Sequence, residues 1–251
     1  TSSNKTSDAS GLYKSTATNT GNPTYYFRGN VTNNYVSFAG QTWRIVRVNE
    51  DGTIRIIMQD GINNTDYEFN SKYDNYTYMY YTNSESKTTL ENWYQTNIGS
   101  KTNLASKVAT GNYYCEQAKA KQSDSDTSGS ATMTPYNKYT PDFKCAIDGN
   151  DKGLVNACVG LLSYDEVVYA GGYPYQNNSN YYLYNSAIRW WTMSPSGLLS
   201  SFLNVWNVNA AGSIGTFGHV ASTYRLRPVL NLTADTLVTG TGTSSDPYVI
   251  S

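Results

Sequence analysis

Short runs of aromatic and β-branched residues, separated by Gly, Asn and Asp, recur from Thr24 onward and predict consecutive β-strands. In Trp43–Val48 the apolar residues alternate with arginine, and a second apolar run follows at Ile54–Ile56. The sequence between these runs is typical of a tight turn, because Gly52 can adopt the positive φ that the turn needs, so we expect a β-hairpin. Residues 1–22 contain almost no apolar positions, which indicates a flexible leader, with ordered structure beginning near Thr24.

Helical periodicity occurs at two places in the chain. Residues 84–98 carry their large apolar side chains close to one helical stripe, at Leu90, Trp93, Tyr94 and Ile98. A second, shorter helix is predicted to begin at Ser163, because Ser163 and Glu166 have the spacing of a capping box, and to end at the glycine pair that starts at Gly171. Residues 63–83 combine Tyr and Asn without a clean period and predict an irregular segment.

The last third of the chain predicts three or four further strands around a glycine turn. Between Leu203 and Asn209, asparagines are interleaved with apolar residues, so polar side chains should be displayed on an otherwise strand-like element. Trp190 and Trp191 are neighbours on a predicted strand and therefore face opposite sides, so we expect one to be buried and one to be partly exposed. Pro228 places the following run at a sheet edge or at a strand start.

Three cysteines allow at most one disulfide within the chain. Cys115 and Cys145 lie in polar, loop-like sequence, whereas Cys158 lies in the apolar run LVNACVGLLSY. We therefore pair the first two and expect Cys158 to be a buried small hydrophobe rather than a nucleophile. The disulfide would tie down a surface insertion around residues 111–157 of a single domain that spans residues 23–251.

The composition points to a neutral, polar surface rather than a charged one. The 251 residues include 24 Tyr, 20 Gly and abundant Asn, but only 15% are charged, and the formal net charge is −1. This charge balance argues against nucleic acid as a partner, and no apolar run is long enough for membrane insertion. Tyr, Ser, Gly and Asn are enriched in binding surfaces, although secreted β-rich proteins share this composition for other reasons. Arginines that alternate with apolar residues on predicted strands are expected on solvated or salt-bridged faces: Arg44, Arg47, Arg55, Arg225 and Arg227.

Candidate catalytic and metal chemistry is sparse in this sequence. The one histidine, His219, would have to serve any Ser-His-Asp or Cys-His site, yet no G-x-S-x-G elbow is present, so we expect an exposed loop side chain in a binding face. A single histidine also argues against a zinc site, and residues 148–151 lack the spaced oxygen series of an EF-hand, so no metal and no cofactor is expected.

Several motifs occur in a fixed order along the chain: YYFRGNVTNNYVSFAGQTWRIVRVNEDGTIRIIMQDG, SYDEVVYAGG, WWTMSP, VWNVNAAG, RLRPVLNL and GTGTSSDPYVI. Together they resemble a family of secreted or surface-anchored proteins of Gram-positive, often gut, bacteria. The C-terminal half is similar to the C-type-lectin-like fold of formylglycine-generating-enzyme-like domains and of variable proteins of diversity-generating retroelements. The resemblance implies an α+β domain with two helices on twisted antiparallel strands. Its N- and C-terminal strands, near Tyr25–Phe27 and Tyr248–Ile250, would be adjacent.

The resemblance also implies a location for the binding face, in the interval 197–224 between WWTMSP and RLRPVLNL. An apolar and aromatic cluster in this glycine-rich stretch of a polar chain would be unusual unless it meets a partner. We therefore expect an extracellular, secreted or cell-surface, non-enzymatic recognition or adhesion domain, whose partner is a protein or glycan on another cell or host surface. The expected contact residues are Leu198, Leu199, Phe202, Asn204, Asn207, Ser213, Thr216, Phe217, His219, Ser222 and Tyr224.

Two other functions compete with recognition. The first is an enzyme acting on glycans or the cell wall through two carboxylates, such as Asp165 with Glu166 or Glu91 with Asp142. Asp165 and Glu166 are also explained as first-turn residues that complement the helix dipole. The second is a structural spacer domain of a larger surface protein. The resemblance further implies that residues of 197–224 could be diversified by a retroelement, which a reverse transcriptase gene beside this one would indicate.

Overall fold

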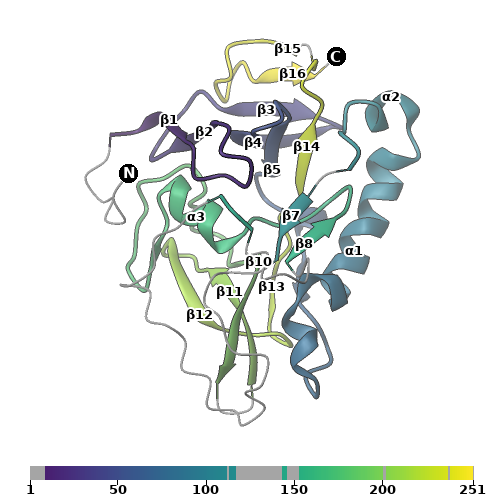
Figure 1. Ribbon diagram of the computed structural model, residues 1–251, viewed down its shortest axis with the longest axis vertical. Helices are drawn as coiled ribbons and strands as arrows, with labels where there is room; N and C mark the ends of the chain where they lie inside the picture. The colour runs from purple at the N-terminus through teal and green to yellow at the C-terminus, as the bar shows by residue number, and fades with distance from the viewer. Residues whose placement is uncertain are drawn as a thin grey trace.

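The computed structural model of the protein describes residues 9–111, 113–116, 143–145, 153–199, 202–236 and 238–250. Strands in these ranges form an eight-stranded sheet, a six-stranded sheet and a two-stranded ladder. In Figure 1 the eight-stranded sheet occupies the upper half of the molecule and the six-stranded sheet the lower half. One continuous set of buried apolar side chains extends through both sheets, so the two halves share a core.

The eight-stranded sheet is built around a long central strand, β4. Its order is β1-β2-β4-β3-β16-β15, and β5 joins β4 to β14. The strands are β1 (Gly11–Ser15), β2 (Thr24–Arg28), β3 (Tyr35–Phe38), β4 (Gln41–Val48), β5 (Ile54–Met58), β14 (Val229–Leu232), β15 (Val238–Thr239) and β16 (Tyr248–Ile250). The predicted hairpin is confirmed, since β4 and β5 pair antiparallel around Gly52, which has a φ of 85°.

The six-stranded sheet contains the predicted binding interval. Its order is β6-β13-β10-β11-β12-β9, with β10, β11 and β12 forming an antiparallel meander. The strands are β6 (Asp66–Glu68), β9 (Tyr173–Pro174), β10 (Trp190–Leu199), β11 (Phe202–Val208), β12 (Ser213–His219) and β13 (Thr223–Arg225). The small ladder pairs β7 (Tyr113–Cys115) with β8 (Leu154–Asn156).

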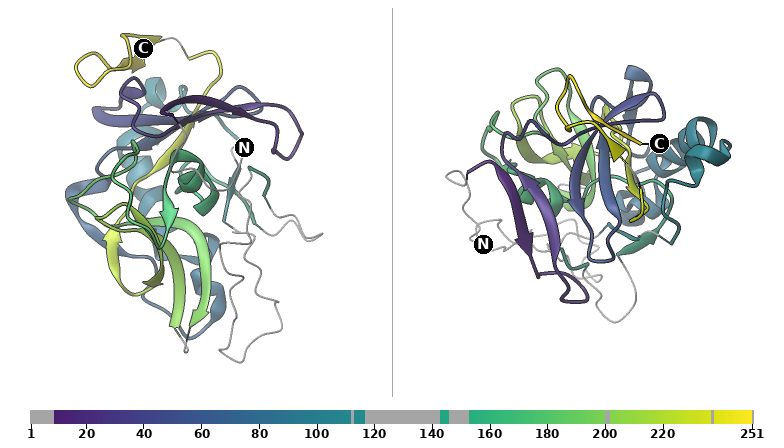
Figure 2. Two further views of the ribbon diagram at one scale, coloured as in Figure 1. Left: turned by 90° about the vertical axis from the view of Figure 1, so that its left-hand side faces the viewer. Right: turned by 90° about the horizontal axis from the view of Figure 1, so that it is seen from above.

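Both predicted helices are present. Ser84 caps α1 (Glu85–Tyr94), which continues into a wider turn at η4 (Gln95–Gly99) and is followed by the single turn α2 (Thr102–Ala105). The capping box of Ser163 and Glu166 begins α3 (Tyr164–Ala170), and Gly171 ends it in the left-handed conformation. Helix α1 runs along one side of the molecule, and α3 lies between the two large sheets in Figure 1 and in the left view of Figure 2.

The expected α+β, C-type-lectin-like arrangement is wrong. The described residues contain sixteen strands but only three α-helices, of 10, 4 and 7 residues, so the structure is mostly β. The sheets are also mixed rather than antiparallel, because β16 pairs parallel with β3, and β12 pairs parallel with β9. The local sequence signals predicted both helices correctly, but such signals carry no information about how many sheets the remaining strands form.

The two ends of the described chain also differ from the prediction. Ordered structure begins before Thr24, because β1 pairs antiparallel with β2 over its whole length, which limits the expected leader to fewer residues than 1–22. Strands β2 and β16 belong to the same sheet but are not adjacent, since β4 and β3 lie between them. The segment 63–83 is not wholly irregular: it contains β6 and the short helices η1 (Ile62–Asn64), η2 (Tyr76–Met79) and η3 (Tyr81–Asn83).

Trp190 and Trp191 are both buried, with exposures of 1% and 0%, so the expectation that one would be partly exposed is wrong. The physical reason is that both faces of β10 are covered. The guanidinium of Arg227 lies over the ring of Trp190, while Trp191 packs against Phe69. Pro228 was placed correctly, because it directly precedes β14, an edge strand that pairs in the sheet only with β5 among the described strands.

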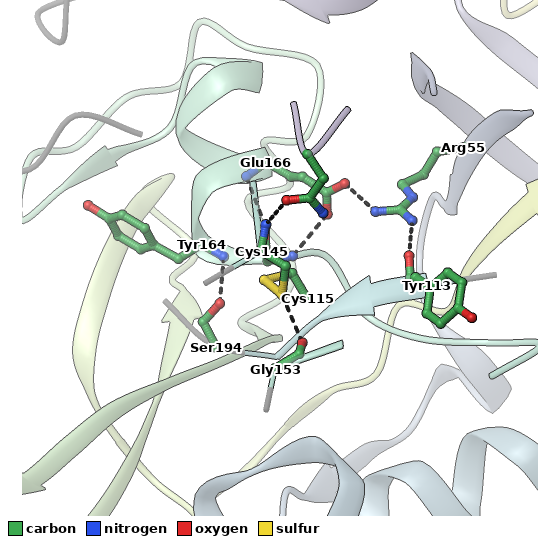
Figure 3. Close-up of a disulfide and its surroundings, with 10 residues drawn as sticks. Arg55, Tyr113, Cys115, Cys145, Gly153, Tyr164, Glu166 and Ser194 are labelled. Atoms are coloured by element: carbon green, nitrogen blue, oxygen red, sulfur yellow. Dashed lines mark hydrogen bonds and ion pairs between the residues drawn. A yellow bond between two sulfur atoms is a disulfide. The ribbon is translucent and has the colours of Figure 1, made fainter. Parts of the chain in front are cut away.

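The predicted disulfide is present between Cys115 and Cys145, whose Cα atoms are 5.4 Å apart. It joins the end of β7 to residues 143–145 beside the β7–β8 ladder (Figure 3). The remainder of the proposed insertion, residues 117–142 and 146–152, lies outside the described residues. Cys158 is exposed, so its predicted burial is wrong: the apolar run around it contributes Val159, Leu161 and Leu162 to the core, but not Cys158 itself.

Candidate functional site

Three aromatic rings from distant parts of the sequence meet at one end of the six-stranded sheet. The ring of His219 lies 5.2 Å from the ring of Tyr73 and 5.0 Å from the ring of Phe202, both in edge-to-face geometry. Tyr73 and Phe202 are each 54% exposed, and His219 is half-buried between them. We call Tyr73, Phe202 and His219 the aromatic triad. It places two exposed rings on either side of the one histidine of the chain.

The meander holds two members of the aromatic triad. Phe202 begins β11 and is paired with Leu199, the last residue of β10. His219 ends β12, where it is paired with Asn204 of β11, so its ring reaches Phe202 across the ladder. Both side chains are therefore carried on paired strands and not on a free loop, contrary to the loop position expected for His219.

The third member is positioned by a different segment. Tyr73 follows β6, and the backbone of Asn70 donates to the carbonyl of Val220, just after β12. The Ser71 hydroxyl donates to the carboxylate of Glu85 at the start of α1. These contacts bring the Tyr73 segment beside the end of the meander. Sequence reasoning missed Tyr73, because one tyrosine among 24 in an aperiodic stretch carries no signal of its own.

The aromatic triad combines exposed ring surface with one buried polar atom. Ring faces carry partial negative charge and ring edges partial positive charge, so an exposed pair of rings offers apolar area with directional contacts. Nε2 of His219 is buried and has no hydrogen-bond partner among the described residues. A ligand could form a hydrogen bond with this atom only if the side chains that bury it moved aside.

Three of the expected contact residues are buried, which is a correction to the predicted binding face. Asn204, Asn207 and Ser213 are 6%, 1% and 4% exposed. Asn204 donates to the carbonyl of Phe202 on the same strand, and Asn207 donates to the carbonyl of Gly215 on β12, so only the Asn207 amide joins two strands of the meander. The interleaved asparagines were expected to face solvent, but β11 lies between β10 and β12 with both of its faces covered.

The remaining contact residues divide into two groups. Ser222 and Tyr224 are half-buried. Tyr224 packs against Trp191, and the guanidinium of Arg189 lies over its ring, so Tyr224 does not join the aromatic triad. The side chains of Leu198, Leu199, Thr216 and Phe217 lie outside the described part of the structure. Of the eleven expected contact residues, the structure therefore brings Phe202 and His219 together at an exposed position.

A second polar cluster surrounds Glu166, where α3 faces the eight-stranded sheet. One carboxylate oxygen of Glu166 accepts from Nη1 of Arg55 at 2.5 Å (Figure 3). The same oxygen accepts from Nε of Arg47 at 3.1 Å, and the other oxygen accepts from the Ser163 amide. Burial alone would raise the pKa of Glu166, but Arg55, Arg47 and the Ser163 amide outweigh it and hold that pKa below its usual value. A carboxyl with a lowered pKa is unsuited to act as a general acid near neutral pH.

The predicted arginine faces are partly corrected. Arg47, Arg55 and Arg225 form salt bridges as expected, the last with Asp66. Arg44 and Arg227 are instead buried, at 3% and 0% exposure. Their guanidinium groups donate mainly to backbone carbonyls and lie over aromatic rings, of Tyr35 for Arg44 and of Trp190 for Arg227. The alternation of arginine with apolar residues in the sequence does not distinguish a solvated arginine from one that is buried under aromatic rings and hydrogen-bonded to backbone carbonyls.

The other candidate carboxylate pair is not assembled in the described residues. Glu91 lies on α1 and pairs with Lys87 one turn away, while Asp142 lies outside the described residues. Within the described ranges, no group of three His, Cys, Asp or Glu side chains could hold a metal ion, and no helix is long and apolar enough to cross a membrane.

Known proteins offer no direct guide to either cluster. In comparisons with family models, characterised proteins and solved structures, this chain matches none of them.

Proposed function

We propose that this protein is a non-enzymatic extracellular recognition domain whose ligand surface centres on the aromatic triad of Tyr73, Phe202 and His219. The observation that carries the proposal is the exposure of two large rings, 54% each, on either side of a half-buried histidine. Among the described residues most aromatic side chains are buried or half-buried; Phe202 is held on paired strands, and Tyr73 lies in the segment that follows β6. A rigid scaffold with exposed rings binds a partner at low entropic cost.

The partner of such a surface is a glycan or protein on another cell. Aromatic rings with a nearby polar atom contact both the apolar face of a sugar ring and the side chains of a protein. An extracellular setting is compatible with the disulfide between Cys115 and Cys145, because disulfides persist in oxidising environments. The neutral, tyrosine-rich composition also accords with a surface that binds by contact area rather than by net charge.

A glycan array and intact cultured epithelial cells provide the binding test. We expect the labelled wild-type protein to bind a restricted set of glycans or to adhere to the cells, and the Tyr73→Ala/Phe202→Ala variant to lose at least tenfold in binding. Tyr175→Ala is the matched control, because Tyr175 is 58% exposed but packs beside Trp206 and not in the aromatic triad. Equal binding by wild type and the double variant, or an equal loss in the control, would refute the proposal.

A further inference from the structure

Residues 143–145, which we call the strap, are held in place by contacts at both ends. At one end, the amide of Phe143 donates to the carbonyl of Ala17 at 2.8 Å. At the other end, the amide of Cys145 donates to Oδ1 of Asn19 at 3.1 Å, and the disulfide joins Cys145 to the last residue of β7. The disulfide is therefore the covalent link between the strap and the β7–β8 ladder.

The ring of Phe143 covers part of the Glu166 cluster. It stacks on the ring of Tyr169, with the centroids 4.1 Å apart and an angle of 14° between the planes, and it lies 5.4 Å from the ring of Tyr26. The guanidinium carbon of Arg47 lies 4.8 Å from the centre of the Phe143 ring, which is a cation–π distance. The Arg47 side chain is only 12% exposed. Because the ring lies against the guanidinium, the strap helps to keep this charge from solvent.

A polar cavity of about 280 Å³ borders the strap. The residues that line it come from the strap, the disulfide and the Glu166 cluster, and include Phe143, Cys115, Cys145, Arg47, Arg55 and Glu166. Figure 3 shows the disulfide, Arg55 and Glu166 in this region. The volume is far larger than the roughly 10–15 Å³ that one water molecule needs, so the space beside the disulfide admits small solutes. Since Cys115 is also partly exposed, a small thiol can reach the disulfide.

The β7–β8 ladder joins the two ends of this part of the chain without the help of the disulfide. Cys115, the last residue of β7, pairs with Leu154, the first residue of β8. The disulfide adds a further attachment between these two strands, at Cys145. Loss of the disulfide therefore leaves the ladder paired and removes only the covalent attachment of the strap. The strap then depends on hydrogen bonds and ring contacts alone, which open in local fluctuations.

We propose that the disulfide between Cys115 and Cys145 is a thiol-sensitive latch, whose reduction releases the strap and uncovers the guanidinium of Arg47. A dithiol reductant supplies the two electrons and two protons that the reaction needs. The S–S bond breaks, both cysteines become thiols, and the reductant is oxidised to its own disulfide. Arg47 is covered while the latch is oxidised and exposed once it is reduced. The latch is separate from the aromatic triad, so it operates whether or not the triad binds a partner.

Modification of arginines by phenylglyoxal tests the latch on the whole chain. The protein is reduced with dithiothreitol, its thiols are blocked with iodoacetamide, both reagents are removed, and modified arginines are then identified by peptide mass spectrometry. We expect Arg47 to react at least tenfold faster in the reduced protein than in the oxidised one. Arg227 is 0% exposed and does not line the cavity, so it reports global unfolding and should stay unmodified in both forms. An equal Arg47 rate in the two forms, or an Arg227 rate that rises with it, would overturn the proposal.

Two variants separate the latch from the ring that it holds. Phe143→Ala removes the ring but keeps the disulfide, so Arg47 should react as fast in this oxidised variant as in the reduced wild type. Phe202→Ala is the matched control, because it truncates an exposed ring that does not line the cavity, and it should leave the Arg47 rate unchanged. Cys115→Ser/Cys145→Ser should show the fast rate without any reductant. A slow Arg47 rate in Phe143→Ala or in the double serine variant, or a fast rate in Phe202→Ala, would show the proposal to be wrong.

Discussion

Apolar side chains are usually buried and charged side chains usually exposed. The end of the six-stranded sheet that carries the aromatic triad and the Glu166 cluster depart from this pattern in opposite ways. At the aromatic end, apolar rings are exposed: Tyr73 and Phe202 face solvent. At the Glu166 cluster, charges are buried: Glu166 and Arg55 are each about 4% exposed. Exposed rings add little to stability, so their presence points to a partner, whereas buried charges must be paired within the protein. If the proposed recognition function holds, stability and binding depend on different parts of this molecule.

The buried cluster should show the largest effect on stability. Glu166→Gln keeps an oxygen for the Ser163 amide but leaves the buried Arg55 and the 12%-exposed Arg47 without the carboxylate that they share. Breaking a buried ion pair from one side costs about 3–5 kcal/mol, so the free energy of unfolding in urea should fall by that amount. Glu91→Gln removes a more exposed pair with Lys87 and should cost less than about 1 kcal/mol. Equal losses in the two variants would contradict the structural role of the Glu166 cluster.

The disulfide should contribute almost as much. Closing a loop with a sequence separation of 30 residues restricts the unfolded chain, which in the chain-entropy model corresponds to about 3–4 kcal/mol. Cys115→Ser/Cys145→Ser should lower the unfolding free energy by that amount, measured by chemical denaturation. Cys158→Ser, at the exposed free thiol, should leave it unchanged. A large loss from Cys158→Ser together with none from the double variant would refute the assigned pairing.

Acid should weaken the buried cluster selectively. The pKa of Glu166 is lowered in the folded protein, so its charged form contributes stability above the ordinary carboxyl pKa of about 4.3, and this contribution is lost as the pH falls through the lowered value. Urea denaturation of wild type from pH 6 to pH 2 should therefore show a steeper loss than Glu166→Gln over the same range. Parallel pH profiles for the two proteins would show that Glu166 is not held charged by its arginines.

The aromatic end should show the smallest effect on stability. Phe202→Ala truncates an exposed ring and should change the unfolding free energy by less than about 0.5 kcal/mol. Phe69→Ala provides the matched contrast, because Phe69 is fully buried against Trp191, and emptying such a site costs about 3–5 kcal/mol. A comparable loss from Phe202→Ala would mean that this ring supports the fold and is not available to a partner.

The sequence predicted those features that depend on neighbouring residues. The hairpin around Gly52 and the capping box of Ser163 and Glu166 were recognisable because turn and cap signals act within a few residues. The pairing of Cys115 with Cys145 was inferred because both lie in polar sequence, whereas Cys158 lies in an apolar run.

Features that depend on distant contacts could not be predicted. Nothing in the alternation of arginine with apolar residues indicates that Arg47 and Arg55 meet a carboxylate more than 100 residues away. The approach of Tyr73 to His219 likewise depends on how β6 and its loop lie against the meander. Both sites form between segments far apart in the chain, and periodicity records only which residues are apolar, not which strands become neighbours.

The most direct measurement of the central claim combines the melting temperature and the cell binding of Tyr73→Ala/Phe202→Ala on the same preparation. The separation of stability from binding predicts a melting temperature within about 2 °C of wild type, because both rings are largely exposed, together with at least a tenfold loss of binding. A variant that melts much earlier, or that melts like wild type and still binds fully, would contradict the claim.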